Sequence, residues 1–291
     1  GAPVDLSNFS PAPLVAEGSP ASMPLLFIHH SCGGQLFAPS GQEQGGDCIY
    51  DAHPNGGDLR AQLAKSGYEI HEASYGSVIG QDTDLFHWLP KFRDQMERVL
   101  TTKQQDETYD PGSTIRNRIV LFKSCFPNNH FVAEGQAPGD PKGPELTLAN
   151  AKATLAALLP EFGKQPDVLF VYVTAPALAP VVSRDRAWKA LAKLALGKPS
   201  HEARALAEAA LARRFHDWAR SPKGWLAGYE GKNVVVFDYY DVLTGAGRSN
   251  LSVYGSAGGR DSHPSSAGNR LAAEAFVPFL NRAARRAGLA P

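Results

Sequence analysis

Cysteine is scarce in this sequence, which has three (Cys32, Cys48 and Cys125) in 291 residues. An odd number leaves at least one thiol without an intramolecular partner, so the chain is not built on a disulfide framework. Neither sign of charge is in excess, with 29 Lys plus Arg against 29 Asp plus Glu. This balance argues against nucleic-acid binding, because proteins that follow the phosphate backbone usually carry a strong basic excess. No apolar run approaches the about 20 residues of a membrane-spanning helix, so no membrane span is expected.

The remaining composition is that of a folded globular protein. Hydrophobic residues make up 43% and charged residues 20% of the chain, which is not the composition of a disordered protein. Residues 1–22 are rich in Pro, Ala and Ser and are expected to form an extended N-terminal segment before a single domain over 23–291. No signal peptide is visible in this segment, which reads like the leader left after an export signal is removed. We therefore expect a secreted or periplasmic protein.

Short apolar runs alternate with helix-like stretches along the domain. The runs predicted as strands are Pro24–His30, Tyr68–Ser74, Arg118–Lys123, Asp167–Thr174 and Asn233–Asp238. The stretches predicted as helices are Leu85–Leu100, Glu145–Leu159, Asp185–Arg220 and Ser266–Ala287, the third lying in a helical insertion at about 184–228. Strand and helix in alternation predict right-handed crossovers and a parallel sheet covered on both faces. The fold class is therefore α/β, doubly wound. The polar stretches Gln104–Ser113 and Glu134–Pro144 are predicted as surface connections.

Small, polar and turn-forming residues follow the predicted strands. Ser31-Cys32-Gly33-Gly34 comes after the first strand, Tyr75-Gly76 after the second and Cys125-Phe126-Pro127-Asn128-Asn129 after the third. Asp261-Ser262-His263 lies just before the last predicted helix. In a doubly wound sheet, ligands bind at the carboxyl ends of the strands. These segments are thus expected to meet at one rim of the sheet.

In this order and spacing, the blocks HHSCGG, SYGSVIG, SCFPNN and DSHPSSAGN resemble those of SGNH/GDSL-type hydrolases, over about residues 24–284. The resemblance implies a flavodoxin-like sheet with strand order 2-1-3-4-5. It also implies a nucleophile at Ser31, a base at His263 and an orienting carboxylate at Asp261. The implied oxyanion hole consists of the N–H groups of Ser31 and Gly76 and the side-chain amide of Asn128.

The implied chemistry explains why these residue types occur. A serine hydroxyl is a weak nucleophile until a neighbouring imidazole accepts its proton. Gly33 and Gly34 permit a tight bend from strand to helix that exposes the hydroxyl of Ser31. Backbone N–H groups and an amide then stabilise the negative charge that develops on the substrate oxygen.

Two details depart from the family pattern. A single residue separates Asp261 from His263, where the family commonly has two, so Asp238, Asp241 or a backbone carbonyl is an alternative orienting group. Spacing also does not separate Asn128 from Asn129 as the amide of the oxyanion hole.

Metal and nucleotide sites are not predicted. His29 and His30 are adjacent in a strand and point to opposite faces, and no further ligand stands at metal-binding spacing from them. The glycines of 255–259 lack the order of a nucleotide-binding loop. We expect no cofactor. The pairs Cys32–Cys125 and Cys32–Cys48 are alternative disulfides, and free thiols are the third possibility. Cys32 itself is an alternative nucleophile.

These observations favour a serine hydrolase that cleaves carboxylic esters, acting as an acyl or acetyl esterase on a small-molecule or carbohydrate ester. The carbohydrate part rests on the family resemblance. Two alternatives are an acyltransferase that passes the acyl group to a sugar hydroxyl and a non-catalytic carbohydrate-binding protein of the same fold.

Overall fold

The computed structural model describes residues 4–181, 196–197 and 199–291. Its centre is a five-stranded parallel sheet with the strand order β4-β1-β7-β8-β9. The strands are β1 (Met23–Ile28), β4 (Tyr68–Ala73), β7 (Ile119–Phe122), β8 (Leu169–Val173) and β9 (Val234–Phe237). Counted among themselves in chain order, they run 2-1-3-4-5. The predicted α/β class, the five predicted strands and their order are confirmed.

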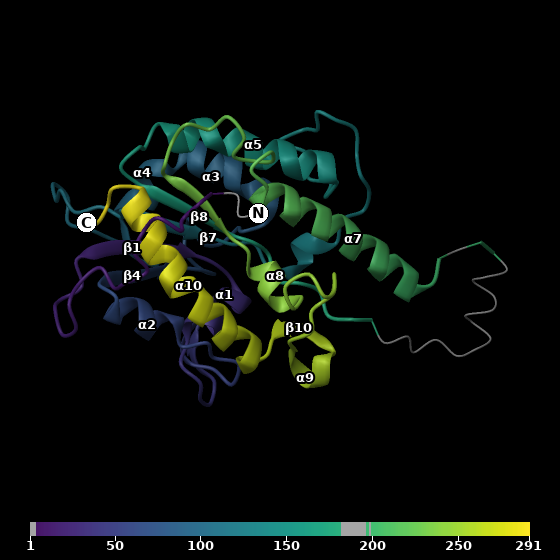
Figure 1. Ribbon diagram of the computed structural model, residues 1–291, viewed down its shortest axis with the longest axis horizontal. Helices are drawn as coiled ribbons and strands as arrows, with labels where there is room; N and C mark the ends of the chain where they lie inside the picture. Colours follow the sequence, from purple (N-terminus) through teal and green to yellow (C-terminus); the bar gives the residue numbers. More distant parts are fainter. Residues whose placement is uncertain (1–3, 182–195, 198) are drawn as a thin grey trace.

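Helices cover both faces of the sheet (Figure 1). One layer contains α1 (Ser31–Phe37), α2 (Leu59–Lys65) and α10 (Ser266–Arg286), which contact one another. The other contains α3 (Trp88–Asp94), α4 (Met96–Thr101), α5 (Leu148–Gly163) and α7 (His201–Arg220). Because both faces are covered, β7, β8 and β9 are buried along their whole length, as continuous apolar runs in parallel sheets usually are.

Shorter elements lie at the rims of the sheet. Two hairpins are formed by β2 (Gln44–Gly46) with β3 (Ile49–Ala52) and by β5 (Thr102–Gln104) with β6 (Glu107–Thr108). The others are the 3-10 turns η1 (Leu85–His87) and η2 (Phe126–Asn129), α8 (Tyr239–Leu243), α9 (Ser256–Gly259) and β10 (Asp261–Pro264). The predicted surface connection over 104–113 contains β6, and its residues are half-buried or exposed, as expected.

The predicted single helix over Leu85–Leu100 is wrong. The segment is divided into η1, α3 and α4, with a non-helical backbone at Gln95. Pro90 has no N–H to donate and is tolerated only in the first turn of a helix, so α3 has to begin close to it, at Trp88. Of the predicted helix Asp185–Arg220 and the insertion around it, residues 182–195 and 198 lie outside the described residues.

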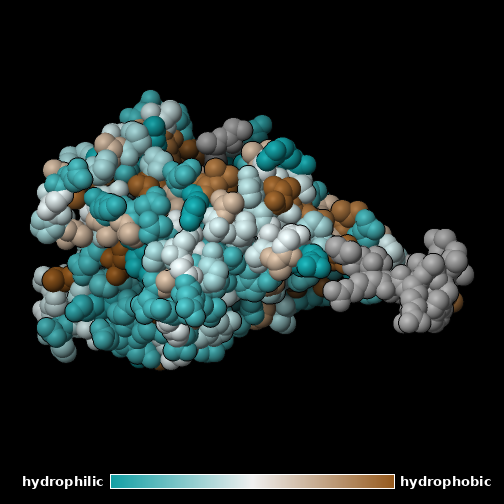
Figure 2. All heavy atoms as spheres, turned by 90° about the horizontal axis from the view of Figure 1, so that it is seen from below, coloured by the Kyte–Doolittle hydropathy of each residue, from teal (hydrophilic) through white to brown (hydrophobic). Residues whose placement is uncertain are grey.

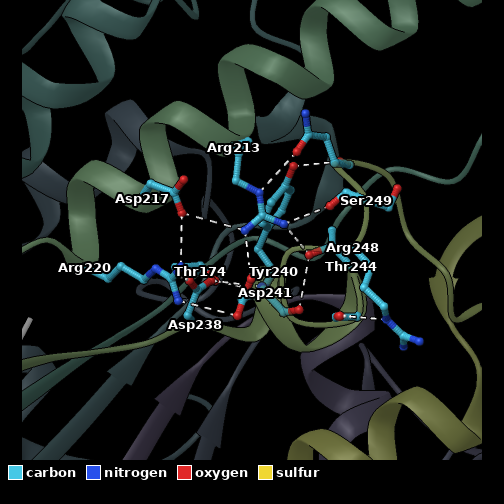
Figure 3. A network of polar contacts seen from close by, with 12 residues as sticks. Thr174, Arg213, Asp217, Arg220, Asp238, Tyr240, Asp241, Thr244, Arg248 and Ser249 are labelled. Atoms are coloured by element: carbon cyan, nitrogen blue, oxygen red, sulfur yellow. Dashed lines mark hydrogen bonds and ion pairs between the residues drawn. The ribbon is translucent and has the colours of Figure 1, made fainter. Parts of the chain in front are cut away.

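A polar network fastens α7 to the loop that follows β9 (Figure 3). The guanidinium of Arg213 donates to Asp241 Oδ1 at 2.8 Å, to the carbonyl of Ser249 at 2.9 Å and to the hydroxyl of Thr244. Its carbon Cζ lies 4.7 Å from the centre of the Tyr240 ring. The planar guanidinium thus joins α7 to α8 through both ion pairing and stacking.

Residues 6–13 lie against α10, held by two of its arginines. Arg282 donates to the carbonyl oxygens of Leu6, Ser7 and Phe9, and Arg285 donates to those of Ser10, Ala12 and Pro13. The view from below (Figure 2) shows a mostly hydrophilic surface on which apolar residues lie in small, separated patches. No helix of the described residues is long and apolar enough to cross a membrane.

Candidate active site

The turn after β1 places Ser31 at the first position of α1. The register pairs Ile28 of β1 with Phe122 of β7, so that three residues later Ser31 and Cys125 leave neighbouring strand ends together. Their side chains meet, with Ser31 Oγ 3.6 Å from Cys125 Sγ. The hydroxyl of Ser31 is therefore at the rim where the blocks after β1 and β7 converge.

Asp261 and His263 form a hydrogen-bonded pair on β10. The Nδ1 atom of His263 lies 2.8 Å from Asp261 Oδ1, and the same oxygen accepts the backbone N–H of His263 at 2.9 Å. One intervening residue in an extended strand directs both side chains to the same side. Burial raises the pKa of the Asp261 carboxyl, but these hydrogen bonds and the nearby imidazole outweigh it and leave that pKa below its usual value.

The other carboxylates considered as orienting groups are engaged elsewhere. Asp238 Oδ1 accepts from Thr174 and from the backbone of Asp241, and its second oxygen faces Arg220. Asp241 pairs with Arg213. Burial raises the pKa of Asp238 to about 6. Of the three candidates, the structure brings Asp261 to His263.

Ser31 and His263 do not form a hydrogen bond in this structure, which describes both residues. His263 instead packs against Phe126, edge to face, with 5.0 Å between the ring centres. Phe126 follows Cys125 directly in the chain, which places the imidazole and the serine at the same rim. Catalytic hydrogen bonds are often long or poorly aligned before substrate binds.

The three expected oxyanion donors are each near a partner from the chain. The N–H of Gly76, a residue at φ +83°, donates to Gln81 Oε1 at 2.9 Å. The amide of Asn128 donates to Asp84 Oδ1 at 3.0 Å, and its oxygen accepts the N–H of Leu85. The N–H of Ser31 faces the sulfur of Cys48.

Asn129, the alternative to Asn128, is a structural clamp. Its amide nitrogen donates to the carbonyl oxygens of Ala175 and Pro176, and its oxygen lies 2.7 Å from His216 Nε2. Burial lowers the pKa of His216 to about 3, so this ring is neutral and Nε2 donates the proton. Since Asn129 is fully buried in these contacts, Asn128 is the better candidate for a substrate-facing amide.

His29 and His30 make separate contacts with oxygen atoms. His29 Nε2 lies 2.9 Å from Glu72 Oε1, whose second oxygen accepts from Arg60 at 2.7 Å. His30 Nε2 lies 2.7 Å from the carbonyl of Gly80, and its ring stacks on Tyr75 with 3.6 Å between centres. Among the described residues, no group of three or more His, Cys, Asp or Glu is placed to hold a metal ion.

The part of the site that the sequence reasoning missed is the pairing of Cys125 with Lys123. Lys123 is fully buried, and its Nζ lies 3.3 Å from both Cys125 Sγ and the carbonyl of Ser124. All three cysteines are free thiols, so neither alternative disulfide is present. Cys32 is fully buried and burial raises its pKa well above the usual value, which argues against it as the nucleophile. A lysine within a predicted buried strand, two residues before a cysteine, was the available signal.

A cleft of about 540 Å³ lies next to this rim, although Ser31, Asp261 and His263 are not among its lining residues. Phe126 and Ser262, the neighbours of Cys125 and His263, form one side of it. Two arginines, Arg204 and Arg260, line it together with His130 and the apolar segment 178–181. Its volume is within the range of sites that hold small ligands.

Comparisons with known proteins identify few similarities. No protein-family model matches the chain, and no curated protein sequence matches it. One solved structure with a similar chain path is that of a Corynascus thermopiles (Myceliophthora fergusii) carbohydrate esterase family 2 (CE2) enzyme plus carbohydrate binding domain. The identity is 14%, the TM-score is 0.41, and the match covers 94% of this chain and 69% of that one.

Proposed function

We propose that this chain is a serine hydrolase of the SGNH type that cleaves carboxylic esters. The observation that carries the proposal is the contact between His263 Nδ1 and Asp261 Oδ1 at 2.8 Å, at the rim where Ser31 begins α1. In this proposal His263 is the base, Asp261 orients it and Ser31 is the nucleophile. The resemblance of the sequence blocks to SGNH hydrolases supports the same roles.

The tautomer of His263 suits this role. When Nδ1–H donates to the Asp261 carboxylate, Nε2 carries the lone pair and is able to accept the proton of Ser31. Substrate binding would then bring the imidazole, which now rests against Phe126, to the serine hydroxyl. Attack of Oγ on the ester carbonyl forms the acyl-enzyme as the alcohol leaves with the proton from His263, and water repeats the sequence to release the acid.

The oxyanion hole in this proposal is made by Ser31, Gly76 and Asn128. Each donor has to exchange a partner for the substrate oxygen: the sulfur of Cys48, the side chain of Gln81 and that of Asp84. The partners belong to loops rather than to the sheet, so such an exchange leaves the strands in place. Each donor commonly contributes about 10²–10³ in turnover.

The substrate we propose is an acyl ester of a carbohydrate or another small alcohol, with the alcohol part in the cleft of about 540 Å³ next to the rim. The cleft is lined by Phe126, an aromatic face on which a sugar ring stacks, and by arginines that donate to hydroxyl or carboxylate oxygens. Transfer of the acyl group to a sugar hydroxyl in the same cleft is the alternative outcome of the second step.

The test combines turnover of a short-chain aryl ester with labelling by a fluorophosphonate that reacts with activated serines. We expect turnover and a label on Ser31 in the wild type, and neither in Ser31→Ala. Ser113→Ala, in an exposed loop, is the matched control and should keep both. Release of free acid in the presence of an acceptor sugar indicates hydrolysis, while an acylated sugar indicates transfer.

A folded wild-type protein that neither turns over the ester nor takes the label would contradict the proposal and favour the non-catalytic binding protein. A label on a residue other than Ser31 would identify that residue as the nucleophile instead.

A further inference from the structure

Besides Ser31, the rim holds a second reactive group. Cys125 is partly exposed and is flanked by Ser31 Oγ at 3.6 Å and by Lys123 Nζ at 3.3 Å. The thiol of Cys32, which is fully buried and belongs to the residue after Ser31, lies near enough to the Cys125 sulfur to influence its pKa. The sulfur of Cys125 is thus surrounded by a second thiol (Cys32), a buried lysine (Lys123) and the proposed nucleophile (Ser31).

Lys123 has a particular requirement for an anionic partner. A lysine ammonium without contact to solvent is strongly destabilised unless it is paired. Its two contacts are the carbonyl of Ser124 and the sulfur of Cys125, and of these only the sulfur can carry a negative charge. The hydrogen bond from Cys32 and the Lys123 ammonium hold the pKa of Cys125 well below its usual value, against the opposing effect of burial.

The strand register brings the segments that carry Cys32 and Cys125 to neighbouring strand ends. Ile28 pairs with Phe122 in adjacent parallel strands, which lie about 4.8 Å apart. Ser31 is three residues beyond Ile28 and Cys125 three beyond Phe122, and their side chains are in contact. Cys32 is the next residue after Ser31, and a disulfide needs its two Cα atoms about 4.4–6.8 Å apart, a separation that neighbouring strand ends can supply.

We propose that Cys125 is a modification site for hydroperoxides, and that Cys32 resolves the oxidised form into a disulfide that switches off Ser31. In the first step the Cys125 thiolate attacks a peroxide oxygen and the O–O bond breaks, which forms Cys125 sulfenic acid and an alkoxide or hydroxide ion. That ion takes a proton from solvent and leaves as alcohol or water. In the second step the Cys32 sulfur attacks the sulfenic sulfur. The S–O bond breaks, and the hydroxide leaves as water with the proton of the Cys32 thiol.

The same contacts make the modification reversible by thiols. Oxidation removes the negative charge of the Cys125 thiolate, which is the partner of Lys123. The loss of this partner stabilises the reduced form relative to the disulfide. A stabilised reduced form gives a disulfide that thiols reduce readily. The effect on Ser31 rests on the function proposed above, because the disulfide moves the sulfur that now contacts its hydroxyl. Formation of the disulfide does not depend on that function.

The primary test treats the intact wild-type protein with stoichiometric hydrogen peroxide and maps the peptides by mass spectrometry. We expect a Cys32–Cys125 disulfide, with the loss of two hydrogen atoms, that dithiothreitol removes. In Cys32→Ser the sulfenic acid should persist and take a dimedone label at Cys125. Cys48→Ser, which removes the third thiol of the region, should still form the disulfide.

The thiolate is tested separately by alkylation with iodoacetamide. We expect the rate at Cys125 to stay high at pH values where an ordinary thiol is protonated, and to fall about tenfold or more at neutral pH in Lys123→Met. If Lys123→Met does not fold, the pH dependence of the wild-type rate decides. His30, Cys48, Tyr75 and Tyr239 are the other titratable groups near the sulfur, and all four are unchanged in that comparison.

Fluorophosphonate labelling of Ser31, measured before and after oxidation, tests the link to the proposed function. The label should fall on oxidation and return with dithiothreitol. A peroxide-treated protein with a Cys32–Cys48 disulfide, or with all thiols intact, would overturn the proposal. If the disulfide forms but the reduced protein takes no serine label, the proposed function fails and the modification site stands.

Discussion

The exposure of Asp261 predicts how much its charge contributes to catalysis. Asp261→Asn keeps an oxygen for the N–H groups of His263 but removes the negative charge opposite the imidazolium that forms in the proposed mechanism. Two unit charges about 4 Å apart attract by about 1 kcal/mol in water and about 4 kcal/mol near a protein surface. The side chains of Asp261 and His263 are 46% and 30% exposed. Because water screens such a pair, we expect a loss of about 1.4–2.7 kcal/mol.

This energy corresponds to a decrease of about 10- to 100-fold in kcat. It is much less than the about 10⁴-fold that accompanies replacement of a buried triad aspartate. The assay is kcat and KM on an aryl ester, with KM expected to change little. The matched control is Asp94→Asn, which removes an exposed carboxylate from α3 and should leave kcat unaltered.

Two results would refute the reasoning. A kcat within about twofold of the wild type would show that Asp261 does not act through His263. A loss of about 10⁴-fold would show that the pair is shielded from water in the working enzyme, contrary to the exposure on which the magnitude rests.

Three further predictions concern the framework around the site. Gly34→Ala should destabilise the fold and disturb the proposed oxyanion hole near Ser31, because its Cβ would lie 1.8 Å from the carbonyl oxygen of Cys48. Urea unfolding measures the first effect and ester turnover the second. A variant with unchanged stability and turnover would argue against this close approach. Arg213→Met should lower the free energy of unfolding by about 2–4 kcal/mol, since Asp241 loses one of its two arginine partners; a loss below about 0.5 kcal/mol would contradict the network in Figure 3. Asp238 should titrate near pH 6 by carbon NMR. Its folded pKa lies above the ordinary value of 3.8, so its contribution to stability is complete below about pH 3.8 and is lost as the pH rises through about 6. A midpoint below pH 4 would contradict its burial.

Local pattern predicted the α/β class and the five strands, whereas the strand order came from the resemblance to SGNH hydrolases. The buried strands β7, β8 and β9 are uninterrupted apolar runs, and such runs occur where both faces of a parallel sheet are covered. The order of the blocks at the strand ends also predicted which segments share a rim, since parallel strands end at the same edge. It did not predict the division of residues 85–100 into three short helices. That division depends on Pro90 and on a turn at Gln95 for which the sequence offers no simple signal.

The contacts within the site were decided by tertiary structure. The sequence favoured Asp261 as the carboxylate beside His263 and left Asp238 and Asp241 as alternatives. Packing directs the first to His263 and the other two to arginines of α7. Spacing likewise left Asn128 and Asn129 equal, until the buried His216 bound one of them. The contact of Cys125 with Lys123 and Ser31 arises because two strands distant in sequence are neighbours in the sheet. Sequence periodicity reports which face of an element is buried, but which polar groups meet there depends on register between strands.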